Sequence, residues 1–257
     1  MSHFEVIDLF AGPGGLGEGF ASYSNHKRFK ILCSVEMDFY ACQTLRGRKA
    51  FLLASETGDQ KFLNRYIERL LHGRQQPIDE ELDGSLWNLA KNIVIKAEMG
   101  TSEGNDKVDE TLNKLKPNDR RVLIGGPPCQ AYSLVGRARN AGNADYDPRN
   151  DKRNYLYTEY LRVLNQVKPA VFVMENVKGI NSAKIEGKPI ISQIFKDLHD
   201  PGKAIAGKTS ATYRLYSLTK DLADLTGETD LNHLDPNDFI IRCEDYGIPQ
   251  ARHRVII

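Results

Sequence analysis

Short apolar runs alternate with helical patterns along this chain. Residues 4–10 (FEVIDLF) and 31–36 (ILCSVE) are apolar and rich in β-branched residues, which predicts two buried strands. Residues 61–72 (KFLNRYIERLLH) repeat their apolar positions every three or four residues and therefore predict a helix. Further strands are expected at 122–124, 171–174, 239–243 and 254–257, and further helices after residue 17 and at 38–48, 155–167 and 190–198.

Strands that alternate with helices predict an α/β fold with a mostly parallel sheet and helices on both faces. The segment from 51 to 118 is harder to interpret. Within it, residues 86–96 are apolar enough for a strand or the edge of a helix, and residues 100–109 are polar and predict a loop. We find no internal repeat in the sequence.

The composition is that of an ordinary globular protein, with 40% hydrophobic and 27% charged residues. A net charge of +1 neither requires nor excludes a nucleic-acid partner, because a local basic patch would suffice. The sequence has no apolar run of about 18 residues and no signal-peptide pattern, so we expect a cytoplasmic protein without a membrane partner. Free thiols and no bound metal are expected from the spacing of Cys33, Cys42, Cys129 and Cys243.

Cys129 stands on a stiff turn at the end of a predicted strand. The apolar run 122–124 ends at two glycines, and Pro127 and Pro128 prevent a helix from starting before the thiol. Open α/β sheets bind their ligands at the carboxyl ends of strands. The thiol is therefore either a nucleophile or, as cysteines often are, a small buried apolar side chain.

A glycine-rich loop follows the first predicted strand. Gly12, Gly14 and Gly17 allow the backbone to approach a ligand, and Glu36, about 20 residues on, can accept hydrogen bonds from ribose hydroxyls. An NAD-dependent dehydrogenase would share this pattern, but Pro13 removes an N–H group that a pyrophosphate would use. A cofactor without phosphates and a plain structural turn fit the loop equally well.

Glu175 ends an apolar strand as Cys129 follows one, so both are expected at the same edge of the sheet. A carboxylic acid beside a thiolate can protonate or hydrogen-bond a ring nitrogen while the thiolate attacks carbon. Arg252 and Arg254 share one face of the last predicted strand. They are either solvated or available to bind an anion or a base.

Four blocks of this sequence, taken in order, resemble the cytosine-C5 DNA methyltransferase family. They are Asp8-Leu-Phe-Ala-Gly-Pro-Gly-Gly15, Gly126-Pro-Pro-Cys-Gln-Ala-Tyr-Ser133, Glu175-Asn-Val177 and Gln250-Ala-Arg-His-Arg254, with Tyr155-Leu-Tyr157 opening the helix expected between the second and third. The resemblance covers nearly the whole chain apart from 51–118 and 181–238. It implies the Rossmann-like fold of the S-adenosylmethionine-dependent methyltransferases.

The resemblance implies S-adenosylmethionine as the cofactor. Glu36 would hold the ribose hydroxyls and Met37 would pack on the adenine. Glu98 is the candidate for the contact to the adenine amino group, although the family's aspartate is missing there. The other residues expected to line the cofactor pocket are Phe10, Ala11, Gly12, Gly14, Gly15, Leu16, Pro128 and Leu156.

The same resemblance implies methyl transfer to C5 of a cytosine in double-stranded DNA. Cys129 would attack C6 and make C5 nucleophilic, Glu175 would stabilise charge on the ring at N3, and Arg252 would contact the base or orient the reacting groups. The target cytosine must be flipped out of the duplex. Residues expected on the DNA side are Gln130, Ser133, Arg137, Arg139, Asn176 and Arg254, with Arg149 and Arg153 in the same loop.

The resemblance ends at Ile257, before the family's target-recognition region and its last cofactor-pocket helix. Residues 1–257 are therefore expected to form an incomplete catalytic domain. This domain would belong to a longer protein or to a split enzyme in which a second polypeptide supplies the rest, and we expect weak or no methylation by this chain alone. Pairing with a restriction endonuclease is also expected from the family.

Three other functions are compatible with parts of the pattern. An RNA cytosine methyltransferase is the main alternative, but that branch carries Pro-Phe-Thr where this chain has Ala131-Tyr-Ser133. An amino-methyltransferase would need an aromatic residue at the position of Cys129. A non-catalytic DNA-binding module would be expected to lack one of the site residues, and Cys129, Glu175 and Arg252 are all present.

Overall fold

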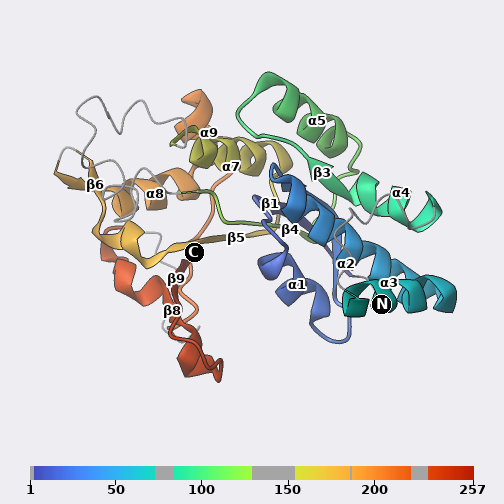
Figure 1. Ribbon diagram of the computed structural model, residues 1–257. Helices are drawn as coiled ribbons and strands as arrows, with labels where there is room; N and C mark the ends of the chain where they lie inside the picture. Colours follow the sequence, from blue (N-terminus) through green and yellow to red (C-terminus); the bar gives the residue numbers. More distant parts are fainter. Residues whose placement is uncertain (1–2, 73–83, 129–153, 186, 221–230) are drawn as a thin grey trace, which may run out of the picture. The chain divides into compact units, whose positions relative to one another are not determined.

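The computed structural model describes residues 3–72, 84–128, 154–185, 187–220 and 231–257 (Figure 1). The chain divides into two compact units, Met1–Val122 and Leu123–Ile257. Strands and helices alternate along the chain, which confirms the predicted Rossmann-like α/β fold with a mostly parallel sheet. None of the helices in the described ranges is long and apolar enough to cross a lipid bilayer.

The first unit is built on parallel strands. β1 (Phe4–Leu9) pairs with β2 (Phe29–Glu36), and β2 pairs with β3 (Val94–Lys96), so their carboxyl ends meet at one edge. β4 (Arg121–Gly125) begins beside β1, where the N–H of Glu5 donates to the carbonyl of Arg120 at 3.1 Å. The predicted strands at 4–10, 31–36 and 122–124 are therefore confirmed.

Helices α1 (Gly15–Ser22) and α2 (Phe39–Thr57) connect the first three strands, together with α3 (Gln60–His72) and α4 (Gly84–Ile93). Both crossovers step across the sheet in the same direction, so α1 and α2 cover the same face. The helices expected at 38–48 and 61–72 are confirmed, and residues 86–96 contribute both a helix and a strand. Small residues on α2 let α3 and α4 approach closely, in a buried cluster of Ala50, Ala54, Phe62, Trp87 and Ala90.

The loop predicted at 100–109 is wrong, because α5 (Ser102–Asn113) occupies most of it. The side chain of Thr101 caps this helix by accepting a hydrogen bond from the N–H of Gly104 at 3.0 Å. Only Gly104, Val108 and Leu112 are buried, one residue per turn. A helix with so narrow an apolar stripe is mostly Ser, Asn, Asp and Glu, which is why its sequence is similar to that of a loop.

The second unit contains α7 (Asn154–Val167), α8 (Ile190–His199) and α9 (Pro201–Ala206), and a short hairpin of β6 (Lys184–Ile185) and β7 (Lys188–Pro189). Its larger sheet is antiparallel: β9 (His253–Ile256) pairs with both β5 (Val171–Val177) and β8 (Ile240–Arg242). Its described residues also form the 3₁₀ segments η3 (Lys178–Ser182), η5 (Leu231–His233), η6 (Pro236–Phe239) and η7 (Cys243–Tyr246).

Two boundaries in this unit differ from the sequence-based expectation. The strand expected to end at Met174 continues through Glu175 to Val177, because β9 pairs with these residues. The strand expected at 239–243 is shortened at both ends by η6 and η7. The helices expected at 155–167 and 190–198 are confirmed as α7 and α8.

Gly104→Ala is expected to destabilise the protein. A Cβ at this position would lie 1.9 Å from the carbonyl oxygen of Glu98, which also accepts a hydrogen bond from the hydroxyl of Thr101 at 2.7 Å. Backbone at this position must shift, so we expect a loss of about 2 kcal/mol or more in the free energy of unfolding, measured by urea denaturation.

Gly19→Ala is the matched control, because Gly19 lies within α1 with no atom within 4 Å of its added Cβ. Removing a glycine from an open helical position is expected to increase stability by up to about 1 kcal/mol. Equal effects of the two substitutions would contradict the packing of α5 described above.

Candidate active site

The turn after β1 is shaped by residues in the left-handed backbone region. Gly12 has a φ of 55° and Gly14, which precedes α1, a φ of 101°. The N–H of Gly14 donates to the carbonyl of Ala11 at 3.0 Å and closes the turn. Phe10 also has a positive φ, 55°, which is uncommon for a non-glycine residue and is typical of strained functional loops.

The side chain of Glu36 ties this turn to the end of β2. One carboxylate oxygen accepts a hydrogen bond from the N–H of Gly12 at 2.8 Å. The other accepts from the N–H groups of Met37 and Asp38, each at 2.8 Å. A carboxylate has about four lone-pair positions, so one remains for a ligand hydroxyl. This geometry fits the predicted role of Glu36.

Apolar side chains lie exposed directly after Glu36. Met37 is 56% exposed and Phe39 37% exposed, and the Lys96 ammonium lies 5.3 Å from the centre of the Phe39 ring. Such a surface suits a flat ring, as predicted for Met37. Glu98 is exposed, and its carbonyl oxygen accepts the hydroxyl of Thr101 at the start of α5.

Asp8 is a buried carboxyl group that the sequence interpretation did not single out. Its side chain is 1% exposed, and neither oxygen has a hydrogen-bond partner in the described part of the chain. Burial, and then the neighbouring Glu36 carboxylate, raise the pKa of Asp8 to about 7. The sequence does carry a signal for this group, because Asp8 is the one acidic residue in the buried part of the apolar run 4–10.

In the second unit, the residues after β4 pack against the end of β5. The Asn176 side chain donates to the carbonyl of Pro127 at 3.1 Å and accepts the N–H of Val177 at 2.8 Å. A Cβ on Gly126 would lie only 3.0 Å from the Glu175 carboxylate, so glycine leaves room for that group. Glu175 and Asn176 therefore lie against the turn that leads to Cys129.

Glu175 is paired with Arg254. The Arg254 Nε lies 2.8 Å from a carboxylate oxygen of Glu175, and both side chains are about a quarter exposed, at 23% and 27%. In the β5–β9 register Arg254 is opposite Val177, two residues from Glu175 and on the same face. Arg252 was predicted to contact the base or to orient the reacting groups. It is exposed and precedes β9, and its carbonyl accepts the N–H of Cys243 at 3.0 Å.

Several predicted site residues lie outside the described residues, and their roles stay predictions. Pro128 and Leu156 are described and are half-buried in the second unit. The predicted residues that are not described are Cys129, Gln130, Ser133, Arg137, Arg139, Arg149 and Arg153.

Two of the other thiols are unsuited to nucleophilic attack. Burial raises the pKa of Cys33 to about 12, and burial also raises the pKa of Cys42. Both are buried and therefore stay protonated and inert near neutral pH. Cys243 is half-buried beside Arg252.

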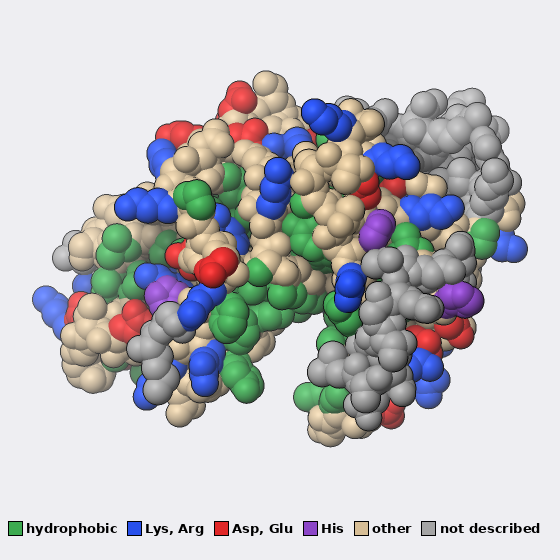
Figure 2. Space-filling model, turned by 180° about the vertical axis from the view of Figure 1, so that it is seen from behind, with side chains coloured by type: hydrophobic (Ala, Val, Ile, Leu, Met, Phe, Trp, Pro, Cys, Tyr) green, Lys and Arg blue, Asp and Glu red, His purple; other side chains and the backbone are tan. Residues whose placement is uncertain are grey.

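The surface charge is mixed. On the face drawn in Figure 2, lysine and arginine side chains are interspersed with acidic ones over the described residues. No group of three or more His, Cys, Asp or Glu side chains with the arrangement of a metal site occurs within the described ranges.

Asp8→Asn is expected to stabilise the protein at high pH. Because the folded-state pKa of Asp8 is raised from 3.8 to about 7, the folded protein retains a proton that the unfolded chain releases between these values. Stability is therefore lost as pH rises from about 4 to about 7. The substitution should increase the free energy of unfolding by up to about 4 kcal/mol at pH 8 and by little at pH 4. Urea denaturation at both pH values measures this, and an equal gain at each would contradict the burial of an ionisable Asp8.

Comparisons with known proteins agree with these features. The family model described as C-5 cytosine-specific DNA methylase matches residues 81–204. Type II methyltransferase M.Bpa9945I of Bacillus paralicheniformis is 30% identical over 98% of this chain and 52% of the relative, and M.AquIA of a Picosynechococcus species is 28% identical over 98% and 70%. DNA (cytosine-5-)-methyltransferase M.ApeKI of Aeropyrum pernix is 30% identical over 71% of this chain and 30% of the relative.

The chain thus spans about half the length of the first of these relatives. The matched segment includes β4, the Gly126–Pro128 turn and the Glu175–Asn176 end of β5. The chain belongs to the C-5 cytosine-specific DNA methylase family.

Proposed function

We propose that this protein transfers a methyl group from S-adenosylmethionine to C5 of a flipped-out cytosine in double-stranded DNA, as the methyltransferase of a restriction-modification system. One observation carries the proposal: the Glu175–Arg254 pair and Asn176 lie against the turn that leads to Cys129. A carboxyl group and a guanidinium beside this turn, together with the thiol that follows it in the sequence, are the groups that activation of a pyrimidine ring needs. The names of the relatives support the DNA substrate and the restriction-modification context.

The residues of the first unit fit S-adenosylmethionine. The carboxylate of Glu36 is oriented by three backbone N–H groups and has capacity for a ribose hydroxyl. Met37 offers an exposed apolar surface for the adenine ring. Phe10 and the backbone of residues 11–16 would complete the cradle, with Pro128 and Leu156, and Glu98 would reach the adenine amino group. When bound, the cofactor supplies an electrophilic methyl group.

The chain's own residues would activate the cytosine. The Cys129 thiolate bonds to C6. The electron pair of the C5–C6 double bond then moves to C5 and is shared with N3, which makes C5 nucleophilic. Glu175 shares a proton with N3, which stabilises the charge that develops there. Arg254 holds Glu175 in place through their ion pair, and Arg252 is available to contact the base or the DNA.

The final steps restore the aromatic ring. After C5 has been methylated, a base removes its proton, the C5–C6 double bond forms again, and the Cys129 sulfur leaves as thiolate.

Asn176 would keep the turn before Cys129 at the end of β5, because its side chain donates a hydrogen bond to the carbonyl of Pro127. The loop residues Gln130, Ser133, Arg137 and Arg139 would contact the DNA around the flipped base, and a second polypeptide that reads the sequence stays a prediction.

Cys129→Ser is expected to abolish covalent capture of DNA. A fluorine at C5 cannot leave as a proton does, so DNA with 5-fluorocytosine should trap the protein as a covalent adduct when S-adenosylmethionine is present. Denaturing gel electrophoresis measures the adduct. Cys243→Ser is the control, because this half-buried thiol should be dispensable. Equal trapping by both variants would remove Cys129 as the nucleophile.

Glu36→Gln is expected to weaken binding of S-adenosylhomocysteine by about tenfold or more. The glutamine amide nitrogen cannot accept the backbone N–H groups that the carboxylate accepts, and hydrogen bonds to a charged group are worth about 1.5–3 kcal/mol. Calorimetric titration measures the affinity. Glu103→Gln, on the exposed side of α5, is the matched control and should bind as the parent protein does. Unchanged affinity of the Glu36 variant would argue against this loop as the donor site.

A further inference from the structure

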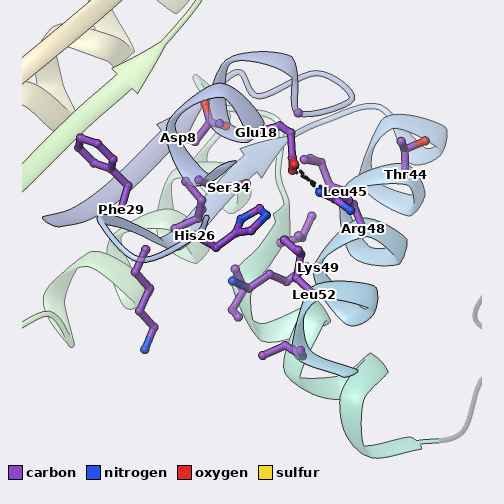
Figure 3. Close-up of a pocket in the computed structure, with 18 of the residues that line it drawn as sticks. Asp8, Glu18, His26, Phe29, Ser34, Thr44, Leu45, Arg48, Lys49 and Leu52 are labelled. Carbon is purple, nitrogen blue, oxygen red and sulfur yellow. Dashed lines mark hydrogen bonds and ion pairs between the residues drawn. The ribbon is translucent and has the colours of Figure 1, made fainter. Parts of the chain in front are cut away.

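A cavity of about 940 Å³ lies in the first unit, between α1 and α2 on one face of β1 and β2 (Figure 3). Its size is within the range of small-molecule sites, roughly 300–1,000 Å³. Phe10, Glu36 and Met37, which we propose hold the methyl donor, do not line it. The cavity shares with the donor loop only residues of the glycine turn, so it is a separate site.

The cavity walls are apolar. Leu45, Leu52 and Leu53 line it from α2, and Phe29 and Ile31 line it from β2. In Figure 3 Leu45, Lys49 and Leu52 lie on the side of α2 that is turned toward His26 and Ser34. Apolar walls on two opposed elements suit a ligand with a flat ring.

The floor of the cavity carries an unsatisfied polar group. Asp8 and Ser34 are opposite each other in the β1–β2 register and are 1% and 4% exposed. Both line the cavity, and neither carboxyl oxygen of Asp8 has a hydrogen-bond partner in the described residues. Because its pKa is raised to about 7, Asp8 is largely protonated in slightly acidic solution. A neutral carboxyl group presents a donor and an acceptor side by side.

The rim of the cavity is basic. Glu18 and Arg48 neutralise each other across the opening, with Nε and Oε2 3.0 Å apart. Burial lowers the pKa of Lys49, while Glu56 and Lys30 act on it in opposite directions. The cavity is further lined by Lys27 and Lys30 and by the acid Glu56, so that, with Lys49, three lysines stand against one carboxylate outside the Glu18–Arg48 pair and the buried Asp8. This excess of positive charge favours an anionic group on the ligand.

We propose that the cavity binds a mononucleotide with an amino-bearing base, adenine or cytosine. These bases each place a ring nitrogen acceptor beside an amino donor, and this pair matches the two hydrogen-bonding positions of a neutral Asp8. The apolar walls enclose the ring, and the phosphate lies at Lys30 and Lys49. This ligand is neither the methyl donor nor the cytosine of the proposed reaction, so the inference goes beyond the proposed function.

Calorimetric titration of the purified protein with adenosine or cytidine 5′-monophosphate at pH 6.5 tests the proposal. Each titration is made both without and with saturating S-adenosylhomocysteine, which blocks the donor site. We expect binding of at least one nucleotide. Asp8→Leu should weaken it by about tenfold or more, because two hydrogen bonds to the base are lost. Asp8→Asn should retain binding, because its amide offers the same donor and acceptor pair as the neutral acid.

The rim is tested separately. Lys30→Gln and Lys49→Gln should each weaken binding severalfold, because each removes a positive charge from the phosphate. Lys61→Gln, on α3 and absent from the lining, is the matched control and should bind as the parent protein does.

Three results would overturn the proposal. They are the absence of binding by both nucleotides at millimolar concentration, loss of nucleotide binding when S-adenosylhomocysteine is added, and equal binding by Asp8→Leu and the parent. Inorganic phosphate that binds as tightly as the nucleotides would remove the role of the base. The covalent trapping of DNA through Cys129 does not depend on this cavity, so the two proposals fail independently.

Discussion

The Glu36 carboxylate, which accepts three backbone N–H groups, is the interaction on which the first unit depends. It joins the turn after β1 to the end of β2 and to the residues that lead into α2. A glycine-rich turn has few side chains with which to hold its own shape, so its conformation must be imposed from a neighbouring strand. Parallel pairing makes this possible, because it brings the carboxyl ends of β1 and β2 to one edge. The residue proposed to recognise the ribose also shapes the loop around it.

The second unit uses the same principle with different groups. The turn after β4 contains two prolines, which have no N–H groups with which to anchor it. Asn176 supplies the missing hydrogen bond through the carbonyl of Pro127. Its neighbour Glu175 is held by Arg254 across the antiparallel β5–β9 pair. A turn with little hydrogen-bonding capacity is therefore positioned by polar side chains from the adjacent strand, and those side chains are also the ones suited to chemistry.

Two carboxyl groups on neighbouring strands show how strongly the surroundings of an acidic side chain determine its chemistry. Glu36 stands at the strand end, where backbone donors surround it. Asp8 stands within β1, beneath Gly17 of α1 and without a hydrogen-bond donor among the described residues, and burial raises its pKa to about 7. An ionised group in such a position is costly, so it persists as a neutral acid or is satisfied by a ligand. The cavity beside Asp8 makes the second possibility concrete.

Local sequence determined the elements and the motifs of this protein. Apolar periodicity is a local property, so residues 4–10, 61–72 and 190–198 predicted their strand and helices without knowledge of their neighbours. The glycine loop, Glu36 and the turn before Cys129 were also readable, because glycine and proline restrict the backbone locally. Tertiary structure alone decided that residues 102–113 form a helix, since its narrow apolar stripe needs a partner surface. It also decided that Arg254 pairs with Glu175, because strand register sets that contact, and that Asp8 is buried beside a cavity, because burial depends on what packs above the strand.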